Sequence, residues 1–152
     1  MTDTVGSTTI ELLTFRLAEQ EYALDIMSVR EIRGWTHATS LPHAPPYMKG
    51  VINLRGTVLP VMDLASRLGM AERKQNERSV IIVVNYEDTM TGLLVDAVSD
   101  IVAVTDEDLQ PPPELAASTA DGVVSALTLI DERMIRVLNL PMTINSFESA
   151  AA

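Results

Sequence analysis

The stretch "KGVINLRGTVLPVMDL", residues 49–64, places one arginine inside a run that is otherwise mostly apolar. Apolar residues stand on both sides of the pair Arg55 and Gly56, which is typical of two strands joined by a tight turn. Pro60 has no N–H to donate to a sheet, so it marks an edge or bulge position. Asp63 precedes "LASRL" and is expected to cap a short helix. The stretch therefore predicts a hairpin followed by a helical turn.

Upstream, apolar residues alternate in "ELLTFRL" and again in "EYALDI", which predicts a β-hairpin over residues 11–26. From there the apolar spacing changes to Val29 and Ile32, and this spacing favours one turn of helix before Gly34. The segment "THATSLPHAPPYMKG" contains three prolines, so it is interpreted as an irregular connection.

Downstream, three segments rich in Val, Ile and Leu are separated by turn residues: "VIIVVNY", "TGLLVDAVSDIVAV" and "VVSALTLIDERMIRVLNL". The charged segment "MAERKQNERS", residues 70–79, is a candidate boundary between two subdomains. About ten short strands and two brief helices are expected in total. This content predicts an all-β protein built from small barrels or a sandwich.

The charge is unevenly distributed along the 152 residues, whose formal net charge is −10. Residues 1–74 carry eight basic and eight acidic side chains, whereas residues 75–152 carry three and thirteen. No basic stripe interleaved with aromatics is present, which argues against nucleic-acid binding. The chain has no cysteine, its N-terminus does not resemble a secretory signal, and its longest apolar stretch is "VIIVV". A cytoplasmic protein is therefore expected, associated with membranes through partners and not by direct insertion.

Candidates for catalysis or metal binding are few. The two histidines, His37 and His43, lie outside any HExxH pattern, and no phosphate-binding or dinucleotide-binding glycine motif is present. Five acidic residues of the later half are interpreted as a solvated surface, with a calcium site as the alternative; they are Asp96, Asp100, Asp106, Glu107 and Asp108. We therefore expect no catalytic residues, no metal and no cofactor, and keep a small β-barrel enzyme or metal-binding protein as a competing hypothesis.

Arg55 is a charged residue within an otherwise mostly apolar stretch, and composition does not explain its position there. An arginine buried without a partner is costly, so it must reach a carboxylate within the fold or project from the turn into solvent. If Arg55 projects into solvent, its planar guanidinium could bind a carboxylate or the backbone of a partner protein. The residues alone leave both possibilities open.

The segment "KGVINLRGTVLPVMDLASRLG" resembles the signature of the CheW family of bacterial chemotaxis coupling proteins. The similarity continues through "EYALDIMSVREIRG", "VIIVVNYEDTMTGLLVDAVSDIVAV" and "LQPPPEL", and it covers residues 11–145. Residues 1–10 and 146–152 are then expected to be flexible termini. The resemblance implies two SH3-like, five-stranded barrels packed together, with approximate subdomains 11–74 and 75–145 and terminal segments that can cross between them.

The resemblance also implies a function. Proteins of this family link the cytoplasmic tips of methyl-accepting chemoreceptors to the regulatory domain of a CheA-type histidine kinase, and so control its autophosphorylation without catalysing a reaction. The same domain occurs within that kinase, but the length of this chain favours a stand-alone adaptor. An adaptor of a related receptor–kinase pathway, for surface motility or development, is the alternative.

Two sets of site residues follow from the resemblance. A receptor-binding groove between the barrels would include Val29, Glu31, Arg55, Val80, Val98 and Ile101. A kinase-binding surface would include Trp35, Tyr47, Gly50 and Val58. The four apolar groove residues could instead be core, and Trp35 and Tyr47 could be ordinary packing residues.

Overall fold

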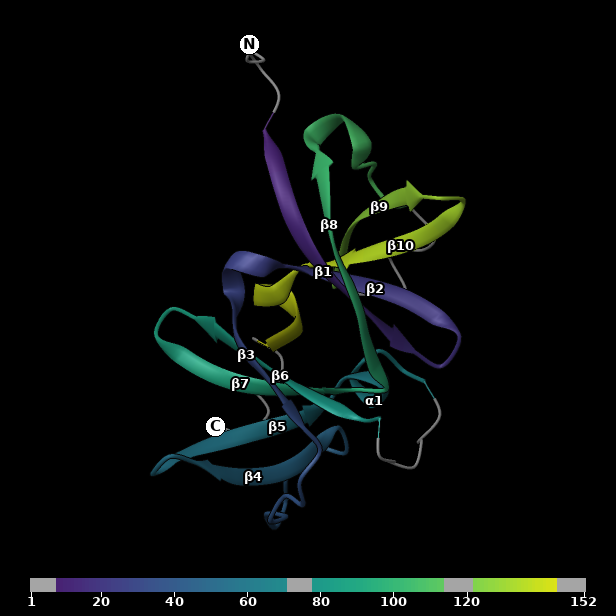
Figure 1. The fold of residues 1–152 in the computed structure, drawn as a ribbon. Coiled ribbons are helices and arrows are strands. Elements are labelled where there is room, and N and C mark those ends of the chain that lie inside the picture. The colour runs from purple at the N-terminus through teal and green to yellow at the C-terminus, as the bar shows by residue number, and fades with distance from the viewer. Residues whose placement is uncertain (1–7, 71–77, 114–121, 145–152) are drawn as a thin grey trace.

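The computed structural model describes residues 8–70, 78–113 and 122–144. Within these residues the chain forms ten strands, which are arranged in two five-stranded sheets (Figure 1). The few helices are short. The structure is therefore mostly β, as the apolar alternation of the sequence predicted.

The first sheet has the strand order β8-β1-β2-β10-β9 and the second has the order β3-β6-β7-β5-β4. The first contains β1 (Thr9–Leu17), β2 (Gln20–Asp25), β8 (Ala97–Thr105), β9 (Val124–Ile130) and β10 (Arg133–Leu138). The second contains β3 (Val29–Gly34), β4 (Met48–Leu54), β5 (Thr57–Asp63), β6 (Val80–Tyr86) and β7 (Thr89–Val95). The helices are α1 (Leu64–Arg67), the 3-10 turns η1 (Ile26–Ser28) and η2 (Asp106–Asp108), and residues 140–144.

Residues 11–74 and residues 75–145 each contribute strands to both sheets. The N-terminal hairpin of β1 and β2 joins the C-terminal strands, because β1 pairs with β8 and β2 pairs in parallel with β10. The second sheet is formed entirely by the middle of the chain. Most of the expected boundary at 70–79 lies outside the described residues.

The two predicted hairpins are present: β1 pairs with β2, and β4 pairs with β5 across the turn at Arg55 and Gly56. The predicted cap is also present, because the Asp63 carboxylate accepts a hydrogen bond from the N–H of Ser66 at the start of α1. The single helical turn expected before Gly34 is present as the 3-10 turn η1, which ends at Ser28. After η1 the chain becomes strand β3, since pairing with β6 overrides the helical spacing of two apolar residues.

Apolar side chains form three clusters, and the largest lies between the sheets. Strand β1 contributes Phe15 to this inter-sheet cluster from one face and Leu12 to the core of the first sheet from the other. Strand β6 likewise places Ile82 in the inter-sheet cluster and Ile81 in the core of the second sheet. Burial on both faces explains why "VIIVV" reads as a continuous apolar run instead of an alternating one.

Among the described residues, the edge strands of each sheet are not hydrogen-bonded to one another, and the two five-stranded sheets still fit the expected SH3-like fold. In the second sheet, strands β3 and β4 form the two edges. The proline-rich connection between them adds one isolated bridge, from Thr39 to Val51, along the edge of β4. Proline cannot donate to a ladder, which explains why this connection does not add a full strand. The arrangement is an SH3-like fold with an open seam.

The first sheet contains a buried ion pair. One guanidinium nitrogen of Arg133 donates to both carboxylate oxygens of Glu21, at 2.9 and 2.7 Å, and the Glu21 side chain is 6% exposed. The pair lies where β2 meets β10 in parallel, so it ties together segments more than a hundred residues apart in the chain.

We expect Arg133→Ala to lower the free energy of unfolding by roughly 1–3 kcal/mol, because it leaves the buried Glu21 carboxylate without its cation. The partial exposure of Arg133 keeps the effect below that of a fully buried pair. Urea denaturation measures it. Arg133→Lys keeps the positive charge, so its free energy of unfolding should fall less than that of Arg133→Ala. Equal free energies of unfolding for Arg133→Ala and the wild type would contradict the prediction.

Within the described residues, none of the helices has the length or apolar character needed to cross a lipid bilayer.

Candidate functional site

The turn between β4 and β5 presents Arg55 at the surface. Arg55 and Gly56 both adopt positive φ, at 51° and 88°, and the Asn53 side-chain oxygen accepts the Gly56 N–H at 2.7 Å. This backbone geometry suits a tight hairpin. The Arg55 side chain is 68% exposed. The arginine is thus a surface residue although it is flanked by core strands.

Arg55 pairs with a carboxylate of the same chain. Its guanidinium donates to Glu31 at 2.6 Å, and Arg33 makes a longer contact of 3.4 Å with the other oxygen of Glu31. Glu31 lies on edge strand β3, whereas Arg55 belongs to the hairpin at the opposite edge of the sheet. The sheet therefore curls until its two edges approach, and this ion-pair cluster of Arg33, Glu31 and Arg55 bridges them.

The contact between Arg55 and Glu31 shifts the pKa of both groups. The hydrogen bond from Arg55 is the main cause that lowers the pKa of Glu31, and the same bond raises the pKa of Arg55. Glu31 is 28% exposed and accessible to solvent ions, so the attraction is partly screened.

We expect the Glu31 carboxyl to titrate at lower pH in the wild type than in Arg55→Ala, as measured by NMR. Because its pKa is lower in the folded than in the unfolded state, the pair stabilises the fold above the ordinary glutamate pKa. That contribution is lost as the pH falls through the folded-state pKa. An unchanged Glu31 titration in Arg55→Ala would show that the pair does not persist in solution.

The apolar residues of the predicted receptor groove lie beside the inter-sheet cluster. Val29, Val80 and Val98 are partly buried and pack against it, and Ile101 on β8 is 53% exposed. Val29 is opposite Val84 and Val80 is opposite Gly34, so the two valines lie at opposite ends of the β3–β6 ladder, about 13 Å apart along the strand. Strands β3 and β8 are the edges of different sheets and both run down the near side of Figure 1.

The four predicted kinase-binding residues do not form one continuous group. Trp35 packs on the core of the second sheet, whereas Tyr47 packs on the inter-sheet cluster and lies under the guanidinium of Arg67, 5.8 Å from the ring centre. Gly50 is buried beneath the backbone of Thr39. Val58 is 69% exposed on β5. Trp35 and Val58 remain candidates for direct contact, and the geometry gives Gly50 a structural role.

Arg33 was missed by the analysis of sequence alone. It stands two residues after Glu31, so both side chains project from the same face of β3, and this spacing in "EIR" was the available signal. The helical interpretation of this segment obscured it. Ile32, on the other face, is also exposed.

The acidic residues of the later half mainly satisfy backbone donors. Asp96 accepts the N–H of Ala18 at 2.7 Å, and Asp108 accepts the N–H of Thr105 at 2.8 Å. Within the described residues, no three histidine, cysteine or acidic side chains are grouped as ligands of a metal ion would be.

Comparison with known proteins assigns this architecture to a family. A family model described as "CheW-like domain" matches residues 11–148. The chain belongs to the CheW-like domain family. This finding confirms the resemblance drawn from "NLRG" and the segments around it.

Individual relatives agree with the family match. This CheW-like protein is 52% identical over 142 residues to the probable chemotaxis protein CheW of Rhizobium etli, with 93% of this chain and 92% of that protein covered. It is 36% identical over 148 residues to the chemotaxis protein CheW of Klebsiella aerogenes, with 97% and 87% covered. The crystal structure of the scaffolding protein TtCheW from Thermoanaerobacter tengcongensis matches with a TM-score of 0.80 at 34% identity, covering 87% of this chain and 90% of that one.

Proposed function

We propose that this CheW-like protein is a chemotaxis adaptor of the cytoplasm, which couples the cytoplasmic tips of chemoreceptors to a CheA-type histidine kinase. It catalyses no reaction and controls the kinase by holding it against the receptor. Support comes from relatives named chemotaxis protein CheW that are matched over most of their length. Their names favour chemotaxis over the alternative pathway of surface motility or development.

The observation that carries the receptor side of the proposal is the exposed ion pair of Arg55 with Glu31 on β3, the strand that also packs Val29 against the inter-sheet cluster. A helical receptor tip docks by placing apolar side chains into a groove, while charged residues at the rim set its register. Val29, Val98 and Ile101 supply apolar surface at the margin of the inter-sheet cluster. The exposed guanidinium of Arg55 can reach a partner while it still contacts Glu31.

The kinase side of the proposal rests on the second sheet. Val58 is a large apolar residue left in solvent, and the partly buried Trp35 packs against the core of the same sheet. A barrel-on-barrel contact with the kinase's regulatory domain would cover both residues. Tyr47 and Gly50 would act indirectly, because they position the connection that flanks this surface.

Reconstitution tests the proposal. Kinase autophosphorylation is measured for the kinase alone, for the kinase with receptor in vesicles, and for the complete mixture with this protein. We expect strong activation in the complete mixture, and co-sedimentation of the kinase with the vesicles that depends on this protein. If the protein binds neither partner, or if it becomes phosphorylated itself, the adaptor function is wrong.

A further inference from the structure

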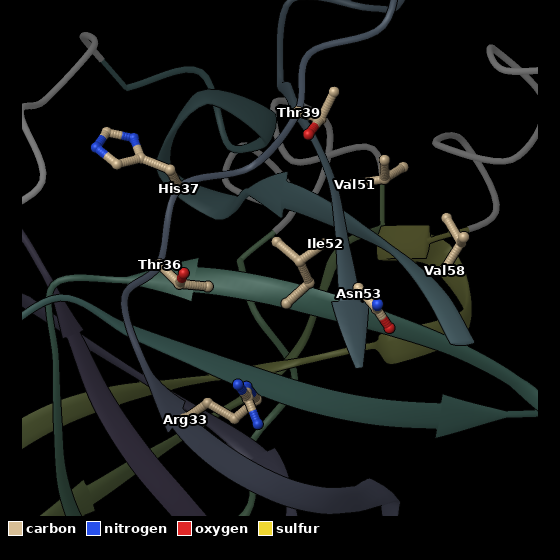
Figure 2. Close-up of a pocket in the computed structure, with 8 residues that line it drawn as sticks. All are labelled: Arg33, Thr36, His37, Thr39, Val51, Ile52, Asn53 and Val58. Carbon is tan, nitrogen blue, oxygen red and sulfur yellow. The ribbon is translucent and has the colours of Figure 1, made fainter. Parts of the chain in front are cut away.

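A surface pocket lies in the open seam of the second sheet, between the end of β3 and the β4–β5 hairpin (Figure 2). Its volume is about 450 Å³. Arg33 and Thr36 line one side, Asn53 and Thr39 provide further polar groups, and Ile52 and Val58 are apolar. Figure 2 shows the guanidinium of Arg33 on the side of the pocket that faces Ile52 and Asn53.

The chemistry of the lining favours an anionic occupant. Of the described residues that line the pocket, none is aspartate or glutamate, although the chain has 21 acidic residues against 11 lysines and arginines. Arg33 supplies positive charge, and the hydroxyl groups of Thr36 and Thr39 can donate hydrogen bonds. Apolar side chains beside these donors can accommodate the aliphatic part of a ligand.

Arg33 has unused capacity to bind a carboxylate. Its contact with Glu31 is 3.4 Å long, whereas Arg55 holds the other oxygen of Glu31 at 2.6 Å. The Nε of Arg33 is buried without a hydrogen-bond partner. Two guanidinium groups therefore share one carboxylate, and the cluster keeps a net positive charge next to the pocket. Arginine binds carboxylates best through its planar fork, which a single long contact does not use.

We propose that this pocket receives an acidic side chain from the regulatory domain of the kinase, with Arg33 as its counter-ion. This inference rests on the proposed function, since Val58 belongs both to the pocket and to the kinase-binding surface. The volume exceeds that of one side chain, so the occupant is a loop tip that carries the acid together with apolar neighbours.

The test measures the affinity of the purified kinase regulatory domain for the full chain by calorimetry. Arg33→Gln should weaken binding at least about tenfold, because a charge-assisted hydrogen bond is lost. Asn53→Asp should weaken it similarly by adding a negative charge to the pocket, while its oxygen can still accept the Gly56 N–H. Arg30→Gln is the matched control, since Arg30 is an exposed arginine of β3 that does not line the pocket.

A double-mutant cycle identifies the acid. Each exposed acidic residue of the kinase domain is changed to its amide, and one change should weaken binding to the wild type but not to Arg33→Gln. Wild-type affinity of both Arg33→Gln and Asn53→Asp, or the absence of a coupled acid, overturns the inference and leaves the adaptor function intact. Failure of the wild type to bind the kinase domain overturns both.

Discussion

Arg55→Ala is expected to remove most receptor-dependent kinase activation while the protein remains folded. Arg55 is exposed, and its loss leaves Glu31 with Arg33 as a remaining partner, so no buried carboxylate is left without a cation. Arginine and alanine both carry a Cβ, so the positive φ at this position is no more strained in the variant. Thermal unfolding close to that of the wild type, combined with lost activation in the reconstituted mixture, would support a receptor contact. A large drop in melting temperature with activation retained by the folded protein would assign Arg55 to structure instead.

Exchanging the charges of Glu31 and Arg55 distinguishes the role of their ion pair within the fold from a direct contact of Arg55 with the receptor. The double variant Glu31→Arg with Arg55→Glu can re-form the pair across the seam but presents a carboxylate where the receptor would meet a guanidinium. If Arg55 binds the receptor, the double variant should fold and still fail to activate the kinase. Full restoration of kinase activation would show that activation requires the ion pair across the seam, and that Arg55 makes no specific receptor contact.

Strands and turns were predictable from sequence because their signals are local. Alternation in "ELLTFRL" predicted strand β1, although its middle is buried on both faces, and the Asp63 cap needs contacts within one helical turn only. The pairing of β1 with β8, by contrast, joins segments about ninety residues apart, and nothing local specifies it. A crossing of terminal segments was implied by the resemblance, but the specific pairing of the N-terminal hairpin with β8 and β10 appeared only in the structure.

The candidate site was predictable in part. Family resemblance pointed to Glu31 and Arg55 separately, but their contact depends on the curl of the second sheet, which brings opposite edges together. Arg33 and the pocket depend on the same curl and on the path of the proline-rich connection. Around Val29 the local signal was misleading, since its helical spacing with Ile32 suggested a helix where the structure has strand β3.

Gly50→Ala is expected to destabilise the fold strongly, because this position accepts no side chain. Gly50 has a φ of 143°, and an added Cβ would lie 2.2 Å from the carbonyl oxygen of Thr39. That oxygen cannot move freely, since Thr39 and Val51 exchange two backbone hydrogen bonds of 2.8 Å. Backbone strain and overpacking together should cost roughly 3 kcal/mol or more.

Thermal unfolding measures this cost, which corresponds to a melting temperature lower by roughly 6–12 °C for a chain of this size. Gly34→Ala is the matched control, because Gly34 lies in the same sheet, has no positive φ and has nothing within 4 Å of an added Cβ. Gly50→Ala should weaken kinase binding only indirectly, because it displaces the connection over residues 35–47 or unfolds part of the protein. If Gly50→Ala melts like Gly34→Ala yet no longer binds the kinase, Gly50 itself belongs to the contact surface and its structural role is wrong.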